Sequence, residues 1–322
     1  MPPSDLVDWL LDSKTPSIRY LTARDLLHLS DSSPQMRLAQ HAIMNAGLVP
    51  AIFAKQTVSG QWANEHSYYT PKYVSTHWSL MLLTELCIDP IDIRFQRGVD
   101  YMLNTTAPQM RDLLKGEDRG LACFWGNLLR YALYAGRDDD PRVQSIVEYL
   151  VSGITVGHGC CQHNDGYSCA WGVVRALWGL AALKQLRHRI DIQDVIEQGL
   201  HFLLDSFHLI EANYPTPDKG KVHPMWFKLN FPLFYQADIL FTLRVLSDLN
   251  RLDHPNAGAA LDWLDAQRLP NGRWYGSSPF RQRTWHELGD NEETARWVSL
   301  QSTVILQRAM HFERATVVRN TA

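Results

Sequence analysis

Residues 170–183 read Ala-Trp-Gly-Val-Val-Arg-Ala-Leu-Trp-Gly-Leu-Ala-Ala-Leu, a run that is apolar on nearly every side of the helix it predicts. A helix that is apolar all round is normally buried on both sides. Three further stretches share this character: residues 78–86, 124–134 and 234–246. The sequence therefore predicts a set of helices that are enclosed by other helices.

A second kind of helix is expected between the buried ones. Four stretches carry charges on one face and place a small or apolar residue three positions before an aromatic residue: 98–103, 146–150, 199–203 and 260–264. The alternation of half-buried and fully buried helices predicts an all-α fold, with inner and outer rings of helices in about six pairs. The expected helices span residues 4–13, 16–30, 34–54, 74–87, 90–105, 120–135, 139–152, 167–186, 192–207, 231–250, 255–267 and 291–311.

Length and composition favour one domain over residues 1–322. The chain is long for a single core, but repeated helix pairs bury their faces against their neighbours. A net charge of −3 with mixed signs predicts no nucleic-acid partner. No apolar run is long enough for a transmembrane helix, and the N-terminus lacks the apolar region of a signal peptide, so we expect a cytoplasmic protein.

The segment 56–62 reads Gln-Thr-Val-Ser-Gly-Gln-Trp and fits the Q-x3-G-x-W half of a QW repeat. Residues 267–274 repeat this pattern with one extra residue. Together with the Gly-x2-aromatic-Leu stretches, these segments resemble squalene-hopene and related terpenoid cyclases. Residues 69–73, Tyr-Thr-Pro-Lys-Tyr, resemble bacterial proteins with prenyltransferase and squalene-cyclase repeats. The resemblance implies that the helix pairs close into an α/α toroid, the fold of terpenoid cyclases and protein prenyltransferases.

Metal-binding residue types recur at the start of the buried helices. His77, Cys123 and Cys169 follow one another at intervals of 46 residues and occupy the same position in three aligned helices. In a toroid, such helix N-termini converge on one end of the central cavity. Thiolates and imidazoles are the ligands that zinc prefers. We therefore predict a zinc site built from Cys123, Cys161, Cys169 and His223.

The zinc site has alternatives. Cys160 and Cys161 are adjacent, and the sequence does not choose between them. Buried free cysteines also pack as small apolar residues, so core packing is the competing interpretation. Residues 165–169, Asp-Gly-Tyr-Ser-Cys, resemble the Asp-Gly-Cys-Tyr-Ser zinc segment of protein prenyltransferases, with the cysteine displaced.

Two residues are candidates for acid–base catalysis. Asp238 lies in a mostly apolar stretch, where burial would raise its pKa and suit it to act as a general acid. The alternative is an ion pair with an arginine such as Arg296. His77 is either a second catalytic group or a hydrogen-bonded core histidine. The Asp-x-Asp-Asp acid of alkene-protonating cyclases is absent from the sequence.

The first functional hypothesis is an enzyme that acts on an isoprenoid or similar apolar substrate, with possible help from zinc. Aromatic faces would shelter the chain and any carbocation. The residues expected to line its central cavity are Trp78, Trp125, Trp171, Tyr235 and Trp297. The alternatives are a non-catalytic toroid that binds or scaffolds, and a zinc enzyme like the lanthipeptide cyclases.

Overall fold

The structure is a computed structural model that describes residues 4–115, 121–160, 162–186, 190–211, 215–216 and 221–320. Its helices are α1 (Ser4–Leu11), α2 (Pro16–Leu21), α3 (Pro34–Asn45), α4 (Leu48–Phe53), α5 (Thr76–Glu85), α6 (Ile93–Leu114), α7 (Ala122–Tyr134), α8 (Pro141–Gly157), α9 (Ala170–Leu186), α10 (Ile190–Leu200), α11 (Ile239–Asp248), α12 (Gly258–Ala266) and α13 (Asn291–Asn320). The described residues are predominantly helical, in agreement with the predicted all-α class.

Short segments complete the secondary structure. Helices α2 and α10 continue as π-helical turns, η1 (Thr22–Leu26) and η3 (His201–Ser206). Four 3₁₀ turns are η2 (Gln162–Asn164), η5 (Pro255–Ala257), η6 (Arg281–Arg283) and η7 (His286–Leu288). Strands β1 (Pro215–Thr216) and β2 (Lys221–Val222) pair in antiparallel fashion. Among the described residues, no helix is both long and apolar enough to cross a membrane.

The two predicted kinds of helix are present. Every residue from Thr76 to Thr84 in α5 is buried, and α7 and α11 are buried almost as completely. By contrast, α6 and α8 bury one stripe each and expose a polar face. Helices α5, α7, α9 and α11 contact one another in succession, α11 also contacts α13, and α13 contacts α2.

Glycines bring α7 and α9 into close contact. A Cβ atom added to Gly179 would lie 2.6 Å from the carbonyl oxygen of Gly126, and one added to Gly126 would overlap the backbone at Arg175. Since real Cβ atoms do not approach backbone this closely, only glycine allows the two helices to pack at this distance.

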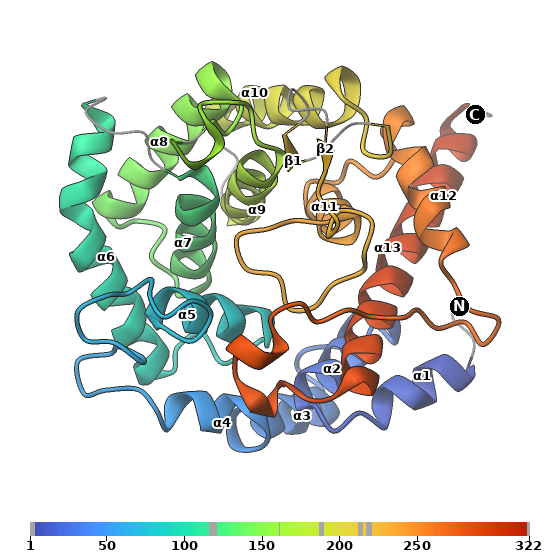
Figure 1. The fold of residues 1–322 in the computed structure, drawn as a ribbon. Coiled ribbons are helices and arrows are strands. Elements are labelled where there is room, and N and C mark those ends of the chain that lie inside the picture. Colours follow the sequence, from blue (N-terminus) through green and yellow to red (C-terminus); the bar gives the residue numbers. More distant parts are fainter. Residues whose placement is uncertain are drawn as a thin grey trace.

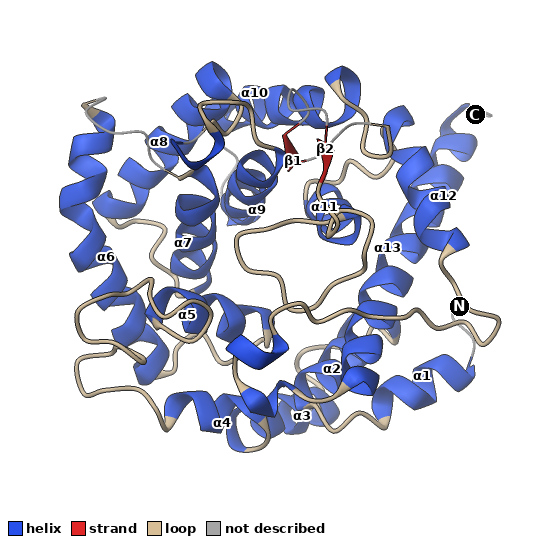
Figure 2. Ribbon diagram, viewed as in Figure 1, coloured by secondary structure: helices blue, strands red, loops and turns tan. Residues whose placement is uncertain are grey.

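The expected helix over residues 231–250 is wrong in its first part. Helix α11 begins only at Ile239, and residues 229–238 form an irregular segment, which we call the central loop. Pro232 has no backbone N–H to donate, and Asp238 accepts from the Phe241 backbone N–H as the N-cap of α11. Figure 2 shows this loop in tan at the centre of the view, surrounded by helices.

The two QW-like segments have the same hydrogen bonds. The indole N–H of Trp62 donates to the carbonyl of Ile52, ten residues earlier, and that of Trp274 donates in the same way to Leu264. Each tryptophan backbone N–H also donates to a hydroxyl on the next buried helix, to Thr76 and Ser299 respectively. The equal spacing of the two indole hydrogen bonds indicates that the segments are structural repeats.

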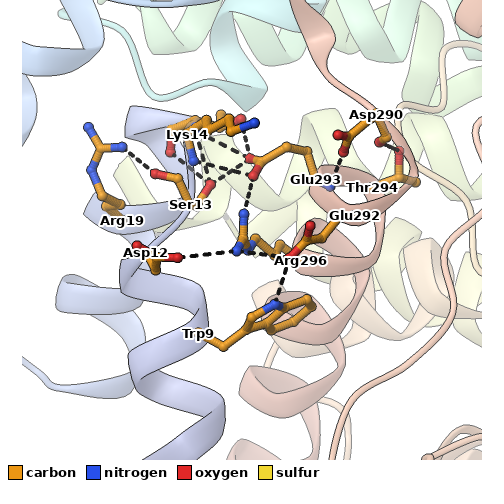
Figure 3. Close-up of polar contacts among 11 residues, drawn as sticks. Trp9, Asp12, Ser13, Lys14, Arg19, Asp290, Glu292, Glu293, Thr294 and Arg296 are labelled. Carbon is orange, nitrogen blue, oxygen red and sulfur yellow. Dashed lines mark hydrogen bonds and ion pairs between the residues drawn. The ribbon is translucent and has the colours of Figure 1, made fainter.

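The N-terminal segment and the start of α13 are joined through a buried carboxylate. Glu293 of α13 accepts from the hydroxyls of Ser13 and Thr15, each at 2.6 Å, and forms an ion pair with Arg296 (Figure 3). Burial opposes ionisation of Glu293, but the bonds from Ser13, Thr15 and Arg296 outweigh it and lower its pKa. In Figure 1, α1 and α13 accordingly lie side by side on the right.

Candidate functional site

The centre of the molecule is occupied by the central loop. Asn127 of α7 donates to the carbonyl of Phe234 at 3.0 Å, and Arg175 of α9 donates through Nε to the carbonyl of Gln236 at 2.9 Å. Phe231 stacks on Trp297 of α13, with ring centroids 4.2 Å apart. The loop is therefore held by three helices that surround it in Figure 1.

Arg175 is fully buried, although it interrupts the most apolar run of the sequence. Its guanidinium carbon lies 3.8 Å from the centroid of the Phe241 ring, in a cation–π contact. Burial lowers its pKa to about 9. The loop carbonyl and the ring together replace water around this charge.

An aromatic cluster packs against the same loop. Phe234 contacts Tyr73, Trp78 and Phe280, with ring centroids 4.6, 5.7 and 5.7 Å away. Tyr235 lies 6.1 Å from Trp78 and 6.0 Å from Trp171. Three predicted substrate residues, Trp78, Trp171 and Tyr235, thus come together, but they contact the chain's own aromatic rings.

The other two predicted substrate residues lie elsewhere. Trp125 is buried and lines a cavity of about 200 Å³ together with residues of α6 and α8. Trp297 is buried and lines a different cavity, described below. The five aromatic residues therefore do not share one cavity among those that the structure reveals.

His77 is enclosed by the aromatic cluster. It is fully buried, its Nδ1 lies 3.2 Å from the Tyr131 hydroxyl, and its ring stacks on Phe124. Its Nε2 has no hydrogen-bond partner among the residues that the structure describes. Burial, assisted by the charge of Arg175, lowers the pKa of His77 to about 3, so the imidazole is neutral at physiological pH.

Asp238 is a buried structural carboxylate at the end of the central loop. One oxygen accepts from the Phe241 N–H at 2.7 Å, and the other accepts from the backbone and side chain of Asn230 at 2.9 and 2.8 Å. Burial raises its pKa to about 6 despite these donors. The expected pairing with Arg296 is not found, since Arg296 pairs with Glu292, Glu293 and Asp12.

The predicted zinc ligands do not form a group in the part of the chain that is described. No three His, Cys, Asp or Glu side chains of those residues come close enough to hold a metal ion. His223 packs edge-on against Trp171, and its Nδ1 accepts from the Met225 backbone N–H at 3.2 Å. Cys161 lies outside the described residues, so the zinc ion stays a prediction and no chemistry is assigned to it.

A cavity of about 210 Å³ lies where α5, α7 and α11 end, and we call it the arginine cavity. Its lining residues include four arginines, three carboxylates and three large aromatic residues: Arg24, Arg130, Arg244, Arg308, Asp25, Glu85, Asp248, Tyr134, Trp178 and Trp297. Three ion pairs hold it in shape, Arg24–Asp25 at 2.8 Å, Arg244–Glu85 at 2.8 Å and Arg130–Asp248 at 3.3 Å.

The cavity becomes more buried toward Glu85. The Glu85 side chain is only 7% exposed, whereas that of Arg24 is 39% exposed. Burial alone would lower the pKa of Arg244, but the Glu85 carboxylate raises it. Cys87 is also in the lining, and burial raises the pKa of its thiol to about 11, so it is not an activated nucleophile.

None of these charged residues was predicted from the sequence as part of a site. The available signal was a charge inside an otherwise apolar helix, as at Glu85 in α5 and Arg244 in α11. Such a charge is rarely buried without a partner. The pairing itself joins residues 159 positions apart, which no local pattern shows.

Comparisons with protein-family models, with curated proteins and with solved structures gave no significant match.

Proposed function

We propose that this chain is an α/α toroid that binds a small ligand and performs no isoprenoid chemistry at its centre. The toroid is supported by the succession of buried helices from α2 and α5 to α13, with α6, α8 and α10 packed in a second succession outside them. The Glu293 contacts with Ser13 and Thr15 would close the ring.

The observation that carries the functional proposal is the position of the central loop. Terpenoid substrates need an open apolar cavity, since the enzyme must surround most of the hydrocarbon chain. Here Asn127 and Arg175 hold backbone carbonyls of the loop where such a cavity would lie. One of the spaces that remain open is the arginine cavity, whose lining is strongly charged. Binding of a small polar ligand suits that lining better than catalysis on a long apolar chain.

An assay of turnover tests this proposal. Purified protein is incubated with farnesyl diphosphate, geranylgeranyl diphosphate or squalene, with Mg²⁺ and Zn²⁺ present, and the products are analysed by gas chromatography and mass spectrometry. We expect no cyclised, hydrolysed or transferred product above the level of a protein-free control. A product formed by the protein would refute the proposal.

The aromatic cluster favours a second candidate, an enzyme that acts on an isoprenoid or similar apolar substrate. The rings of Trp78, Tyr235 and Trp171 could shelter a carbocation if the central loop moved aside. Asp238 and His77 would then be the groups available for proton transfer. This candidate predicts that any product found in the assay is lost in Asp238→Asn and His77→Gln variants. The lanthipeptide-type alternative depends on zinc and stays a prediction with it.

A further inference from the structure

Counted over its described residues, the lining of the arginine cavity has one more positive than negative charge. Three of its four arginines are paired with carboxylates, whereas Arg308 donates to the Ser247 hydroxyl at 2.9 Å. Among the residues whose side chains are described, Arg308 has no carboxylate partner. Arginine pairs well with carboxylates, often through two hydrogen bonds. A singly charged anion would therefore balance the cavity.

Two residues of the lining each have a buried polar atom that finds no hydrogen-bond partner in the described part of the chain. These are Oε1 of Glu85, which accepts hydrogen bonds, and Nε1 of Trp297, which donates one. Both side chains are more than nine-tenths buried, with Trp297 only 1% exposed. Leaving such groups unpaired costs about 1–3 kcal/mol each. A hydroxyl group can both donate and accept, so it matches this pair of atoms.

Arg308 and the two buried polar atoms lie at different depths in the arginine cavity. Arg308 is exposed at the rim, whereas the side chains of Glu85 and Trp297 are buried. On the far side of Glu85 and Arg244, a cavity of about 10 Å³ reaches Phe231 and Leu233 of the central loop. This second space is only about the size of one water molecule, so a ligand that enters from the rim has to end near Glu85.

We infer that the arginine cavity binds a small hydroxycarboxylic acid. Its carboxylate pairs with Arg308 at the rim, and its hydroxyl donates to Glu85 Oε1 and accepts from Trp297 Nε1. The inference rests on the proposed function, because it names the ligand class of the binding protein proposed above. A dianionic phosphate fits less well, since it would overcompensate the single excess charge.

Isothermal titration calorimetry with three probes tests this inference. Glycolate, 3-hydroxybutyrate and 4-hydroxybenzoate place the carboxylate and the hydroxyl at increasing separations. Butyrate and benzoate lack the hydroxyl, and phenol lacks the carboxylate. We expect at least one hydroxy acid to bind, and we expect its matched analogues to bind about tenfold more weakly or not at all. If no hydroxy acid binds, or if the analogues bind equally well, the inference is wrong.

Variants locate the binding site. Arg308→Met removes an exposed charge and should weaken binding of the preferred hydroxy acid about tenfold or more. Trp297→Phe should weaken binding of the hydroxy acid. It should leave the affinity for the hydroxyl-free analogue, which binds more weakly, unchanged. The control is Arg97→Met, another exposed arginine, on α6 outside the cavity, which should leave the affinity within about twofold of the parent protein. Undiminished binding by the Arg308→Met variant would overturn the assignment.

The two proposals fail in different experiments. Turnover of an isoprenoid would refute the proposed function, whatever the calorimetry shows. Absence of hydroxy-acid binding in a protein that also turns over no isoprenoid would refute only the inferred ligand class.

Discussion

Nε of Arg175 lies 2.9 Å from the carbonyl oxygen of Gln236, so a fully buried guanidinium on α9 holds the central loop in the middle of the molecule. Burying a charge is costly, and here the loop carbonyl and the Phe241 ring offset that cost. Removal of the charge leaves the carbonyl without its donor. Arg175 is therefore one of the side chains on which the packing of the centre depends.

Replacing Arg175 with methionine should destabilise the protein. The variant keeps much of the side-chain volume but leaves the Gln236 carbonyl buried without its donor, so we expect the free energy of unfolding to fall by about 3 kcal/mol. Urea denaturation followed by circular dichroism measures this change. Arg97→Met is the control and should change stability by no more than about 0.5 kcal/mol. Equal stabilities for the two variants would show that Arg175 does not hold the loop.

Glu293→Gln should loosen the junction between the N-terminal segment and α13. The glutamine cannot form the ion pair with Arg296 or accept as strongly from Ser13 and Thr15, so we expect a loss of about 3 kcal/mol near pH 7. The neighbouring Glu292→Gln is the matched control, since the Glu292 side chain is 58% exposed, and it should cost less than about 1 kcal/mol.

The effect of Glu293 should also depend on pH. Its folded-state pKa is lowered, so its stabilising contribution is present above the unfolded value of 4.5 and is lost as the pH falls through the folded value. The stability difference between the parent protein and Glu293→Gln should therefore shrink in acid. A difference that stays constant from pH 7 down to the acid unfolding transition would contradict this contribution.

The contribution of Asp238 to stability should depend on pH in the opposite direction. Its pKa is raised from 3.8 to about 6 in the folded protein, so the stability linked to its proton is fully present below pH 3.8 and lost as the pH rises through 6. We expect the parent protein to lose up to about 3 kcal/mol relative to Asp238→Asn between pH 4 and pH 7. Urea midpoints at several pH values in this interval measure the difference, and parallel pH profiles would rule out the raised pKa.

The two QW-like segments should respond equally to mutation. Trp62→Phe and Trp274→Phe each remove an indole N–H from a buried carbonyl ten residues earlier, so each should cost about 2 kcal/mol of unfolding free energy. Trp263→Phe is the control because its half-buried indole contacts the Phe227 ring and donates no hydrogen bond among the described residues. If only one of the variants Trp62→Phe and Trp274→Phe is destabilised, the two segments are not equivalent repeats.

Much of the helix pattern could be predicted from the sequence, because it depends on local periodicity. The apolar runs at residues 78–86 and 124–134 lie within α5 and α7 almost as expected. The QW pattern likewise marked Trp62 and Trp274, although the hydrogen bonds place Arg268, and not Gln267, at the position of Gln56. Both the helix periodicity and the QW pattern can therefore be recognised from residues that are close together in the sequence.

The central loop could not be predicted in this way. Residues 231–238 are apolar enough to continue α11, and the loop is fixed instead by side chains from distant helices, such as Asn127 and Arg175. The arginine cavity was missed for the same reason, since Glu85 and Arg244 come together only in the folded chain. The aligned His77, Cys123 and Cys169 illustrate the converse, because regular spacing alone did not bring three ligands together among the described residues.

Hydrogen exchange of the central loop tests the filled centre most directly. The Phe231 N–H donates to the Ser277 carbonyl at 2.9 Å and the Asn230 N–H donates to Asp238 at 2.9 Å, both in buried residues. We predict that the backbone amides of residues 229–238 exchange as slowly as those of α9 at neutral pH. Mass spectrometry of peptides that cover the two segments measures both rates. Exchange within seconds, as in the exposed turn at residues 58–59, would show that the loop does not fill the centre and that a central cavity is open.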